Sequence, residues 1–249
     1  MLVTANGRQI SCEIEGPADA PAVVFVHGLA ASGSVWAEQA GLLSQRFRTV
    51  RFDMRSHGDS SPDPAPCTRS DLVADLAGLL DALDLASVSL VGHSAGGVVA
   101  MQSAVEISER VDSLVLVGTA SECNERTAAW YRSTADTAAT EGGESAMKAM
   151  GMKRGSGPVP DGAGLGQMAR AMASINDEPL TEALRAVEIP TLIIVGDKDF
   201  LGAGGSVILS RTIAGSELEI VEGRGHGIYI EDPGWFATRV GDFIAAVVF

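Results

Sequence analysis

The stretch Gly92-His93-Ser94-Ala95-Gly96-Gly97 decides the fold. It follows the apolar run 87–91 and precedes a segment rich in Ala and Val, so it predicts a sharp turn from a strand into a helix. Glycines two residues before and two residues after Ser94 let the chain turn tightly in a strained conformation. At such a turn the serine is lifted out of the sheet, beside the backbone N–H groups that begin the helix.

Apolar strands alternate with helical stretches on both sides of this turn. Such alternation predicts a mostly parallel sheet of about eight strands with helices on both faces, in a single α/β domain over residues 1–249. Asn6-Gly7 predicts a hairpin that adds an antiparallel edge. The predicted strands are 2–5, 8–14, 22–26, 48–52, 87–91, 111–117, 191–195 and 217–221, and the predicted helices are 33–46, 71–83, 96–108 and 233–248.

The composition excludes several classes of function. The chain has 249 residues and a net charge of −14, which argues against nucleic acid and against an electrostatic membrane anchor. No apolar run approaches the length of a membrane span, and the first residues do not resemble a secretory signal. The three cysteines are widely spaced, which is typical of reduced thiols in a cytoplasmic protein rather than of disulfides or a zinc site.

Four further motifs accompany the serine turn, and with it they resemble compact members of the α/β-hydrolase fold. They are His27-Gly28, the run Asp53-Met54-Arg55-Ser56-His57-Gly58-Asp59-Ser60, Gly196-Asp197-Lys198-Asp199 and Gly225-His226-Gly227. The resemblance extends nearly from end to end and implies a serine hydrolase with a Ser-His-Asp triad. Ser56 stands where the family usually has glycine, and we expect this difference to affect only the geometry of the loop.

Ser94 is the predicted nucleophile and His226 the predicted general base. Of the four histidines, only His226 follows the serine in the sequence, and it lies in a glycine-flanked loop. The family pattern places the catalytic carboxylate at Asp199, three residues after a glycine. Asp197 points the same way along an extended chain and stays an alternative. Glu122, after the sixth strand, is a further candidate for the acid.

The oxyanion hole needs two backbone N–H donors. Ala95 directly follows the nucleophile and should supply one of them, and the resemblance points to Leu29 for the other. Beside them, His27 and His93 are predicted to be structural or to line the pocket, as is His57. Asp53 precedes the nucleophile, so we interpret it as a structural carboxylate that caps its loop together with Arg55 and His57.

Residues 121–187 interrupt the alternation of strands and helices, at the place where the α/β-hydrolase fold inserts a cap over its pocket. We therefore expect a small helical cap or lid there. The segment contains Trp130, Tyr131 and five of the eight methionines, and flexible thioether side chains suit a pocket for varied apolar groups. The predicted pocket residues of the cap are Trp130, Met147, Met168 and Met172, with Met150 and Met152 as further members of the methionine set.

The resemblance implies hydrolysis of a carboxylic ester or lactone through an acyl-enzyme, and neither a cofactor nor a metal ion is predicted. The segment 121–187 has seven basic and nine acidic residues, so the acidity belongs to the rest of the chain and favours a neutral or apolar small-molecule substrate. Three alternatives stay open. A carbon–carbon bond hydrolase and a cofactor-free haloperoxidase or perhydrolase share the fold, and a ligand-sensing protein could retain the scaffold with little turnover.

Overall fold

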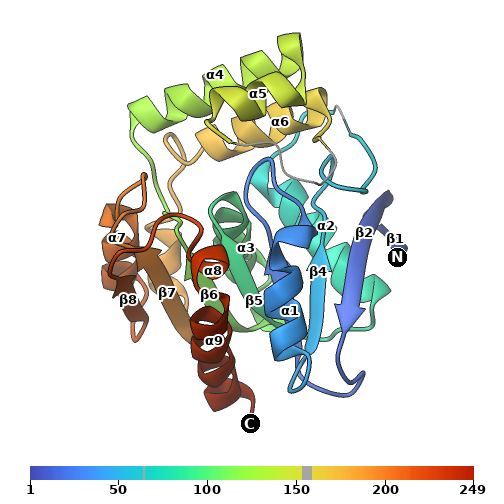
Figure 1. The fold of residues 1–249 in the computed structure, drawn as a ribbon, viewed down its shortest axis with the longest axis vertical. Coiled ribbons are helices and arrows are strands. Elements are labelled where there is room, and N and C mark those ends of the chain that lie inside the picture. The colour runs from blue at the N-terminus through green and yellow to red at the C-terminus, as the bar shows by residue number, and fades with distance from the viewer. Residues whose placement is uncertain (64, 153–158) are drawn as a thin grey trace.

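The structure is a computed structural model and describes residues 1–63, 65–152 and 159–249. An eight-stranded sheet forms its centre, in the order β1-β2-β4-β3-β5-β6-β7-β8 (Figure 1). The pairs β1–β2 and β2–β4 are antiparallel, and all other pairs are parallel, so the predicted mostly parallel sheet with an antiparallel edge is confirmed. The strands are β1 (Leu2–Ala5), β2 (Arg8–Glu15), β3 (Ala22–Val26), β4 (Arg48–Phe52), β5 (Val88–His93), β6 (Val111–Val117), β7 (Thr191–Gly196) and β8 (Glu217–Val221).

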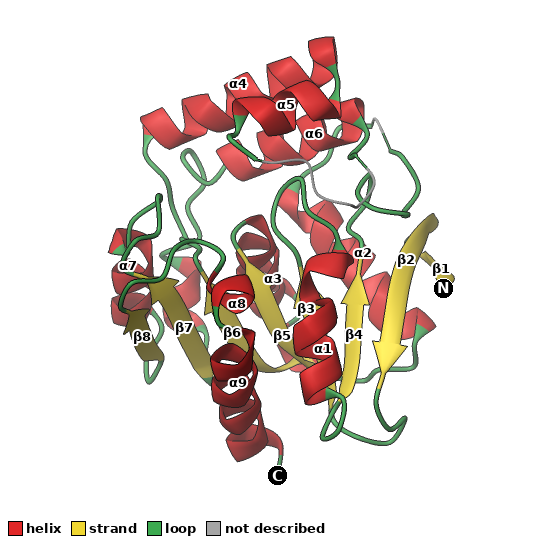
Figure 2. Ribbon diagram, viewed as in Figure 1, coloured by secondary structure: helices red, strands yellow, loops and turns green. Residues whose placement is uncertain are grey.

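Helices cover both faces of the sheet (Figure 2). Successive side chains of a strand point to opposite faces, and the fully buried strand β3 shows this division: Val24 and Val26 belong to one hydrophobic cluster, and Val23 and Phe25 belong to the other. The first cluster also contains residues of α2 (Arg69–Ala82), α3 (Ala95–Glu106) and α7 (Gly204–Thr212). The second contains residues of α1 (Ala37–Leu43), α8 (Ile228–Glu231) and α9 (Pro233–Val248).

Local sequence signals explain where two of these helices begin. Thr68 and Asp71 form a reciprocal capping box at the start of α2. Asp232 caps α9 by accepting a hydrogen bond from the Trp235 amide, and Pro233 takes the first helical position, as the sequence predicts. Both caps satisfy backbone N–H groups that a helix start otherwise leaves without partners.

Three further helices form a separate layer beyond the carboxyl ends of the parallel strands (Figure 1). They are α4 (Glu125–Glu141), α5 (Gly143–Ala149) and α6 (Gly162–Ala173), and we call them the three-helix layer. Asn124 caps α4 and Asp161 caps α6, each with its side-chain oxygen on a backbone amide. Small residues such as Ala128 and Ala135 are fully buried on α4, which allows α4 and α6 to pack closely.

Beyond shifts of one or two residues at element ends, the structure differs from the sequence predictions at three helices near the ends of the strands. The predicted helix 33–46 is a 3-10 turn, Gly33–Trp36, followed by the shorter α1. The helix α7 was not predicted, because its glycine-rich start weakens the helical pattern. The short α8 follows the His226 loop and was not predicted either. These helices lie beside the loops that carry the predicted catalytic residues.

Candidate active site

Ser94 lies in the turn between β5 and α3 with φ 53° and ψ −116°, a strained backbone conformation for a side-chain-bearing residue. Close packing explains the glycines on either side. A Cβ on Gly92 would lie 2.5 Å from the Gly96 carbonyl oxygen, and a Cβ on Gly96 would lie 2.2 Å from the carbonyl oxygen of Val26. The backbone oxygen of Ser94 accepts a hydrogen bond from the Thr119 hydroxyl at 2.8 Å. The predicted strand–turn–helix geometry is therefore present.

Two buried histidines hold the loop that follows β3. The Met54 amide donates to Nε2 of His27 at 3.0 Å, and the Ala30 amide donates to Nε2 of His57 at 3.2 Å. Each ring donates from Nδ1 to a backbone oxygen, so both are neutral. Burial lowers the pKa of His27 to about 3, and burial also lowers the pKa of His57. The two rings therefore connect the β3 loop rigidly to the β4 loop.

Two backbone amides remain free beside Ser94. Within the described part of the chain, neither the Leu29 amide nor the Ala95 amide donates a hydrogen bond to a protein group. Leu29 follows β3 in the loop that His57 holds, and Ala95 is the first residue of α3. Backbone N–H groups inside a protein are normally hydrogen-bonded. Two free donors beside one serine are therefore available to bind a ligand oxygen.

The imidazole of His226 is paired with Asp199. Nδ1 of His226 lies 2.8 Å from Oδ2 of Asp199, whose side chain is 1 % exposed. The other carboxylate oxygen accepts the Leu201 amide at 2.8 Å, so the orientation of Asp199 is fixed on both sides. His226 itself is 19 % exposed and follows β8. Its loop thus brings Nδ1 to the carboxylate that follows β7.

The two alternative acids have other partners. Asp197 accepts the Gly223 amide at 2.7 Å and the Lys198 ammonium at 2.9 Å, and that ammonium holds its pKa below the usual value. Glu122 accepts the Thr181 hydroxyl at 2.5 Å. Neither carboxylate is hydrogen-bonded to His226 within the described residues, so the structure pairs His226 with Asp199.

His93 contacts the His226 loop directly. Its Nε2 lies 3.0 Å from the backbone oxygen of His226, so Nε2 carries the proton and donates it. Its ring packs edge-on against Tyr229, with centroids 4.9 Å apart. Burial, together with the neighbouring His226, lowers the pKa of His93 well below its usual value. Among the described residues, no group pairs with its buried Nδ1. His93 is therefore neutral and structural as well as pocket-lining.

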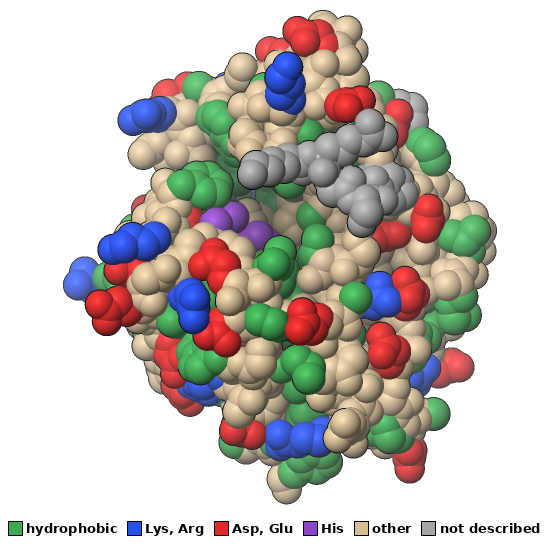
Figure 3. Space-filling view, viewed as in Figure 1, with side chains coloured by type: hydrophobic (Ala, Val, Ile, Leu, Met, Phe, Trp, Pro, Cys, Tyr) green, Lys and Arg blue, Asp and Glu red, His purple; other side chains and the backbone are tan. Residues whose placement is uncertain are grey.

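A pocket of about 400 Å³ opens on Ser94 below the three-helix layer. In Figure 3, histidine side chains are visible in a hollow at this level of the molecule. Ser94, His226, His93 and Leu29 line this pocket, together with the predicted Trp130. Tyr131 of α4 also contributes, as do Met150 and Met152 from the segment between α5 and α6. The lining is mainly apolar, as the methionine-rich segment leads one to expect.

Four predicted pocket residues lie elsewhere. His27 is fully buried and holds the β3 loop, while Met168 and Met172 are buried in the hydrophobic cluster that contains α3 and α6. Met147 lines a separate hollow of about 200 Å³ with Glu144 and Val159. His27 thus has the structural position that was one of its two predicted roles. Met168 and Met172 do not line the pocket, because the hydrophobic face of α6 packs into the core.

Sequence reasoning also missed part of the lining. Phe200 and Leu201 directly follow Asp199, and Tyr229 and Ile230 follow His226 by three and four residues. Their proximity in the sequence to two predicted catalytic residues was the available signal. Phe200 is 71 % exposed, and its ring packs edge-on against the His226 ring, with the ring centroids 4.7 Å apart. Val35, near the start of the first helical turn, completes the apolar wall.

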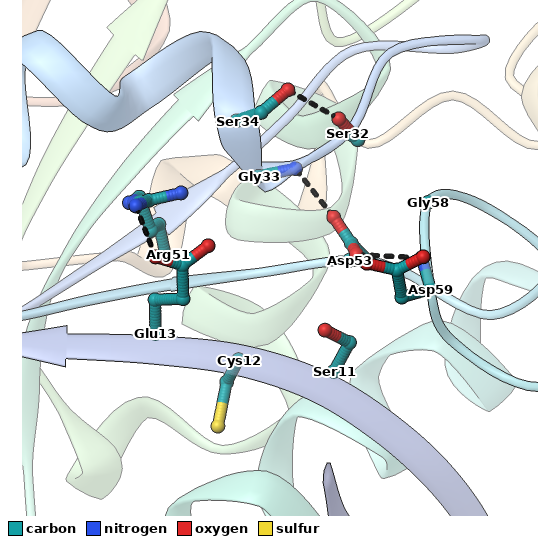
Figure 4. A pocket seen from close by; sticks show the side chains of 10 residues that line it. All are labelled: Ser11, Cys12, Glu13, Ser32, Gly33, Ser34, Arg51, Asp53, Gly58 and Asp59. Carbon is teal, nitrogen blue, oxygen red and sulfur yellow. Dashed lines mark hydrogen bonds and ion pairs between the residues drawn. The ribbon is translucent and has the colours of Figure 1, made fainter. Parts of the chain in front are cut away.

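A second, polar hollow of about 250 Å³ lies between β2, β4 and the loops after β3 and β4 (Figure 4). Asp53 lies in it and accepts the Gly33 amide at 2.7 Å and the Asp59 amide at 2.9 Å. The predicted structural role of Asp53 is thus present with other partners, since Arg55 pairs with Asp75 at 2.6 Å. The polar groups of this hollow mainly bind one another.

Ser56 has a backbone conformation that glycine adopts more readily than serine. Its φ is 60°, in the left-handed region, and its hydroxyl accepts the Asp63 amide at 2.7 Å. If Gly164 of α6 carried a Cβ, that atom would lie only 2.0 Å from the Cβ of Ser56. Ser56 is therefore in tight contact with α6. The difference from the family pattern therefore changes packing against the three-helix layer as well as the loop.

Comparison with known proteins agrees with this geometry. A sequence model of the alpha/beta hydrolase family matches residues 23–239. The chain belongs to this family.

Among its relatives is "Putative carbamate hydrolase RutD" of Pantoea ananatis, 28 % identical over 91 % of this chain and 89 % of that protein. The 3-oxoadipate enol-lactonase 2 of Acinetobacter baylyi is 26 % identical over 96 % of this chain and 94 % of that protein. The crystal structure of the enol-lactonase from Burkholderia xenovorans LB400 superposes with a TM-score of 0.89 at 26 % identity and covers 98 % of this chain and all of that one. These relatives support a hydrolase.

Two further observations concern the described residues of this hydrolase. None of their helices has both the length and the apolar character that crossing a bilayer requires. They also contain no group of three or more His, Cys, Asp and Glu side chains arranged to hold a metal ion.

Proposed function

We propose that the protein is a serine hydrolase that cleaves a carboxylic ester or a lactone. The observation that carries the proposal is the hydrogen bond of 2.8 Å between Nδ1 of His226 and the buried Asp199, beside a pocket that Ser94 and His226 both line. Asp199 fixes the tautomer that leaves Nε2 of His226 free to accept a proton. Ser94 supplies a hydroxyl on a strained turn that lines the same pocket as His226.

In the proposed reaction, the Ser94 oxygen attacks the acyl carbon and Nε2 of His226 accepts the hydroxyl proton. The oxyanion binds the free amides of Leu29 and Ala95, and each such donor is typically worth about 2.7 to 4 kcal/mol in the transition state. His226 then returns the proton to the leaving alcohol. Water then attacks the acyl carbon while His226 takes its proton, and His226 returns that proton to the Ser94 oxygen as the bond to the acyl group breaks, which releases the carboxylic acid and the Ser94 hydroxyl.

The three-helix layer, within residues 121–187, is proposed to act as the cap of this single domain. This role as a cap is supported by four residues of the segment that line the pocket: Trp130, Tyr131, Met150 and Met152. An apolar wall above the nucleophile favours an apolar group on the substrate.

The test uses p-nitrophenyl butyrate as substrate. Wild-type protein should turn over many equivalents and should react with a fluorophosphonate probe at Ser94, and Ser94→Ala should abolish both. Labelling without turnover would favour a ligand-sensing protein, while the absence of both would reject the triad. Product analysis separates the other two alternatives: a carbon–carbon bond hydrolase would cleave a vinylogous diketone much faster than the ester, and a perhydrolase would form a peroxyacid from a carboxylic acid and hydrogen peroxide.

A further inference from the structure

Ser94 lies between two chambers of different chemistry. The pocket described above is one, and the second, of about 210 Å³, shares Ser94, Tyr131 and Leu201 with it. The second chamber lies between the β6 loop, the start of α4 and α7, and we call it the β6 chamber. A substrate attacked at Ser94 therefore has room for two arms, one on each side of its reacting carbonyl group.

The β6 chamber is lined by polar side chains on one wall. Thr119, Glu122, Cys123, Asn124 and Thr127 contribute to it. Glu122 carries the only charge among the described lining residues of either chamber. A carboxylate in a pocket wall attracts a positive group and repels an anion. The two chambers thus differ in their electrostatic preference as well as in their polarity.

The carboxylate of Glu122 is held in place by a chain of hydroxyl groups. The Thr181 hydroxyl lies 2.5 Å from Oε2 of Glu122, and the Ser121 hydroxyl lies 2.8 Å from the Thr181 oxygen. A carboxylate can only accept, so Thr181 donates to Glu122 and fully buried Ser121 donates to Thr181. This relay fixes the direction of Glu122 and leaves its charge intact. None of the described Lys and Arg residues forms an ion pair with Glu122, and the chain as a whole carries −14.

We propose that the β6 chamber binds a positively charged arm of the substrate, an amine or a quaternary ammonium group, through Glu122. The inference rests on the proposed function, since Ser94 is what joins the two chambers. The substrate is then an ester with an apolar arm in the larger pocket and a cationic arm in the β6 chamber. The ring of Tyr131 lines both chambers and can contribute a cation–π contact. This refines the expectation of a neutral or apolar substrate.

The first experiment compares two thioesters of nearly identical shape, 2-(trimethylammonio)ethyl thioacetate and 3,3-dimethylbutyl thioacetate. Wild-type protein should show a kcat/KM about three- to tenfold higher for the cation, the combined effect of an ion pair with the exposed Glu122 and an aromatic contribution. Glu122→Gln retains an acceptor for Thr181 but removes the charge, so the ratio should fall to about one. Glu141→Gln removes an equal charge at the far end of α4, outside the chamber, and should leave the ratio unchanged.

An unchanged ratio in Glu122→Gln, or a wild-type preference for the neutral thioester, would overturn the proposal. Turnover of p-nitrophenyl butyrate is measured beside it and reports on the proposed function alone. A protein that turns over this ester but shows no preference for the cation refutes the cation site and leaves the hydrolase intact.

A second measurement needs no turnover. Cys123 lines the β6 chamber and is partly exposed, whereas Cys12 and Cys67 are buried. In Ser94→Ala, choline should slow the alkylation of Cys123 by iodoacetamide, followed by mass spectrometry, and 3,3-dimethylbutan-1-ol should not. The protection should disappear in Ser94→Ala with Glu122→Gln. Equal protection by the two alcohols, or none by either, would reject the cation site even if the protein hydrolyses no ester.

Discussion

Nε2 of His93 donates a hydrogen bond of 3.0 Å to the backbone oxygen of His226. The side chain before the predicted nucleophile therefore holds the loop that carries the predicted base. The two rings also lie close together, with centroids 4.5 Å apart. Since His93 is the last residue of β5 and directly precedes Ser94, this bond ties the position of the His226 loop to that of Ser94, although the predicted nucleophile and the predicted base are 132 positions apart in the sequence.

We expect His93→Phe to lower kcat about tenfold with little change in KM for p-nitrophenyl butyrate. Phenylalanine keeps the ring packing against Tyr229 but cannot donate to the His226 carbonyl group, so the base is held less firmly. The melting temperature should change little, because the substitution also removes a buried, unpaired Nδ1.

His93→Gln is the matched variant, since its amide can donate a hydrogen bond. Its kcat should lie between those of wild type and His93→Phe. If both variants lost kcat only to the extent that they lost melting temperature, general destabilisation would explain the loss. That result would contradict a positioning role for His93.

Asp199→Asn should lose far more activity than Asp197→Asn. Asparagine at position 199 would favour the wrong tautomer of His226, and in a triad of this kind that substitution costs about 10⁴-fold in kcat. Asp197 is bonded to Gly223 and Lys198, so its substitution should reduce kcat by less than about threefold. Steady-state kinetics of the two variants at one pH decide the question. Equal losses, or a larger loss in Asp197→Asn, would remove Asp199 from the mechanism.

The sequence predicts the strands closely because each is a short, continuous apolar run between turn residues. All eight predicted strands are present, and β5 extends two residues further, to His93. The residues at the carboxyl ends of these strands could also be predicted from the sequence. Ser94, Asp199 and His226 follow strands β5, β7 and β8, and the carboxyl ends of these parallel strands lie at one edge of the sheet.

The lining of the pocket could not be predicted in the same way. Met168 and Met172 occupy one face of α6, and only tertiary packing decides whether that face meets the core or a ligand. The contribution of Phe200 and Ile230 depends on how two loops fold, for which no periodic pattern exists. The Asp53 partners differ from the prediction for the same reason, since they come from loops that meet only in the folded chain.

We expect Gly96→Ala to prevent folding or to reduce the free energy of unfolding strongly. The new Cβ would lie 2.2 Å from the Val26 carbonyl oxygen, and neither of these backbone segments can move without displacing the serine turn. Gly204→Ala is the control, because a Cβ there meets nothing within 4 Å and Gly204 is the first residue of α7. Soluble yield and urea unfolding compare the two. A Gly96→Ala protein as stable as Gly204→Ala would show that the turn tolerates a side chain.

The free energy of unfolding should fall steeply as the pH decreases below about 6.5, the usual pKa of a histidine. His27, His57 and His93 have lowered pKa values in the folded protein, so the unfolded chain binds more protons than the native state in this range. Their stabilisation is fully present above about pH 6.5 and is lost as the pH falls, for His27 down to about pH 3. For each of these histidines, the ratio of folded to unfolded protein falls by up to about tenfold for each pH unit of acidification.

Urea unfolding between pH 7.5 and 5.5 measures this slope, in a range where carboxyl groups contribute little. His27→Gln should reduce the slope by about one proton, even if the variant is less stable throughout, because the slope and the absolute stability are independent readouts. Protonation of His27 must break the bond from the Met54 amide, so the effect has a structural origin in the β3 loop. A slope that is the same in wild type and His27→Gln would show that His27 does not contribute to the loss of stability in acid.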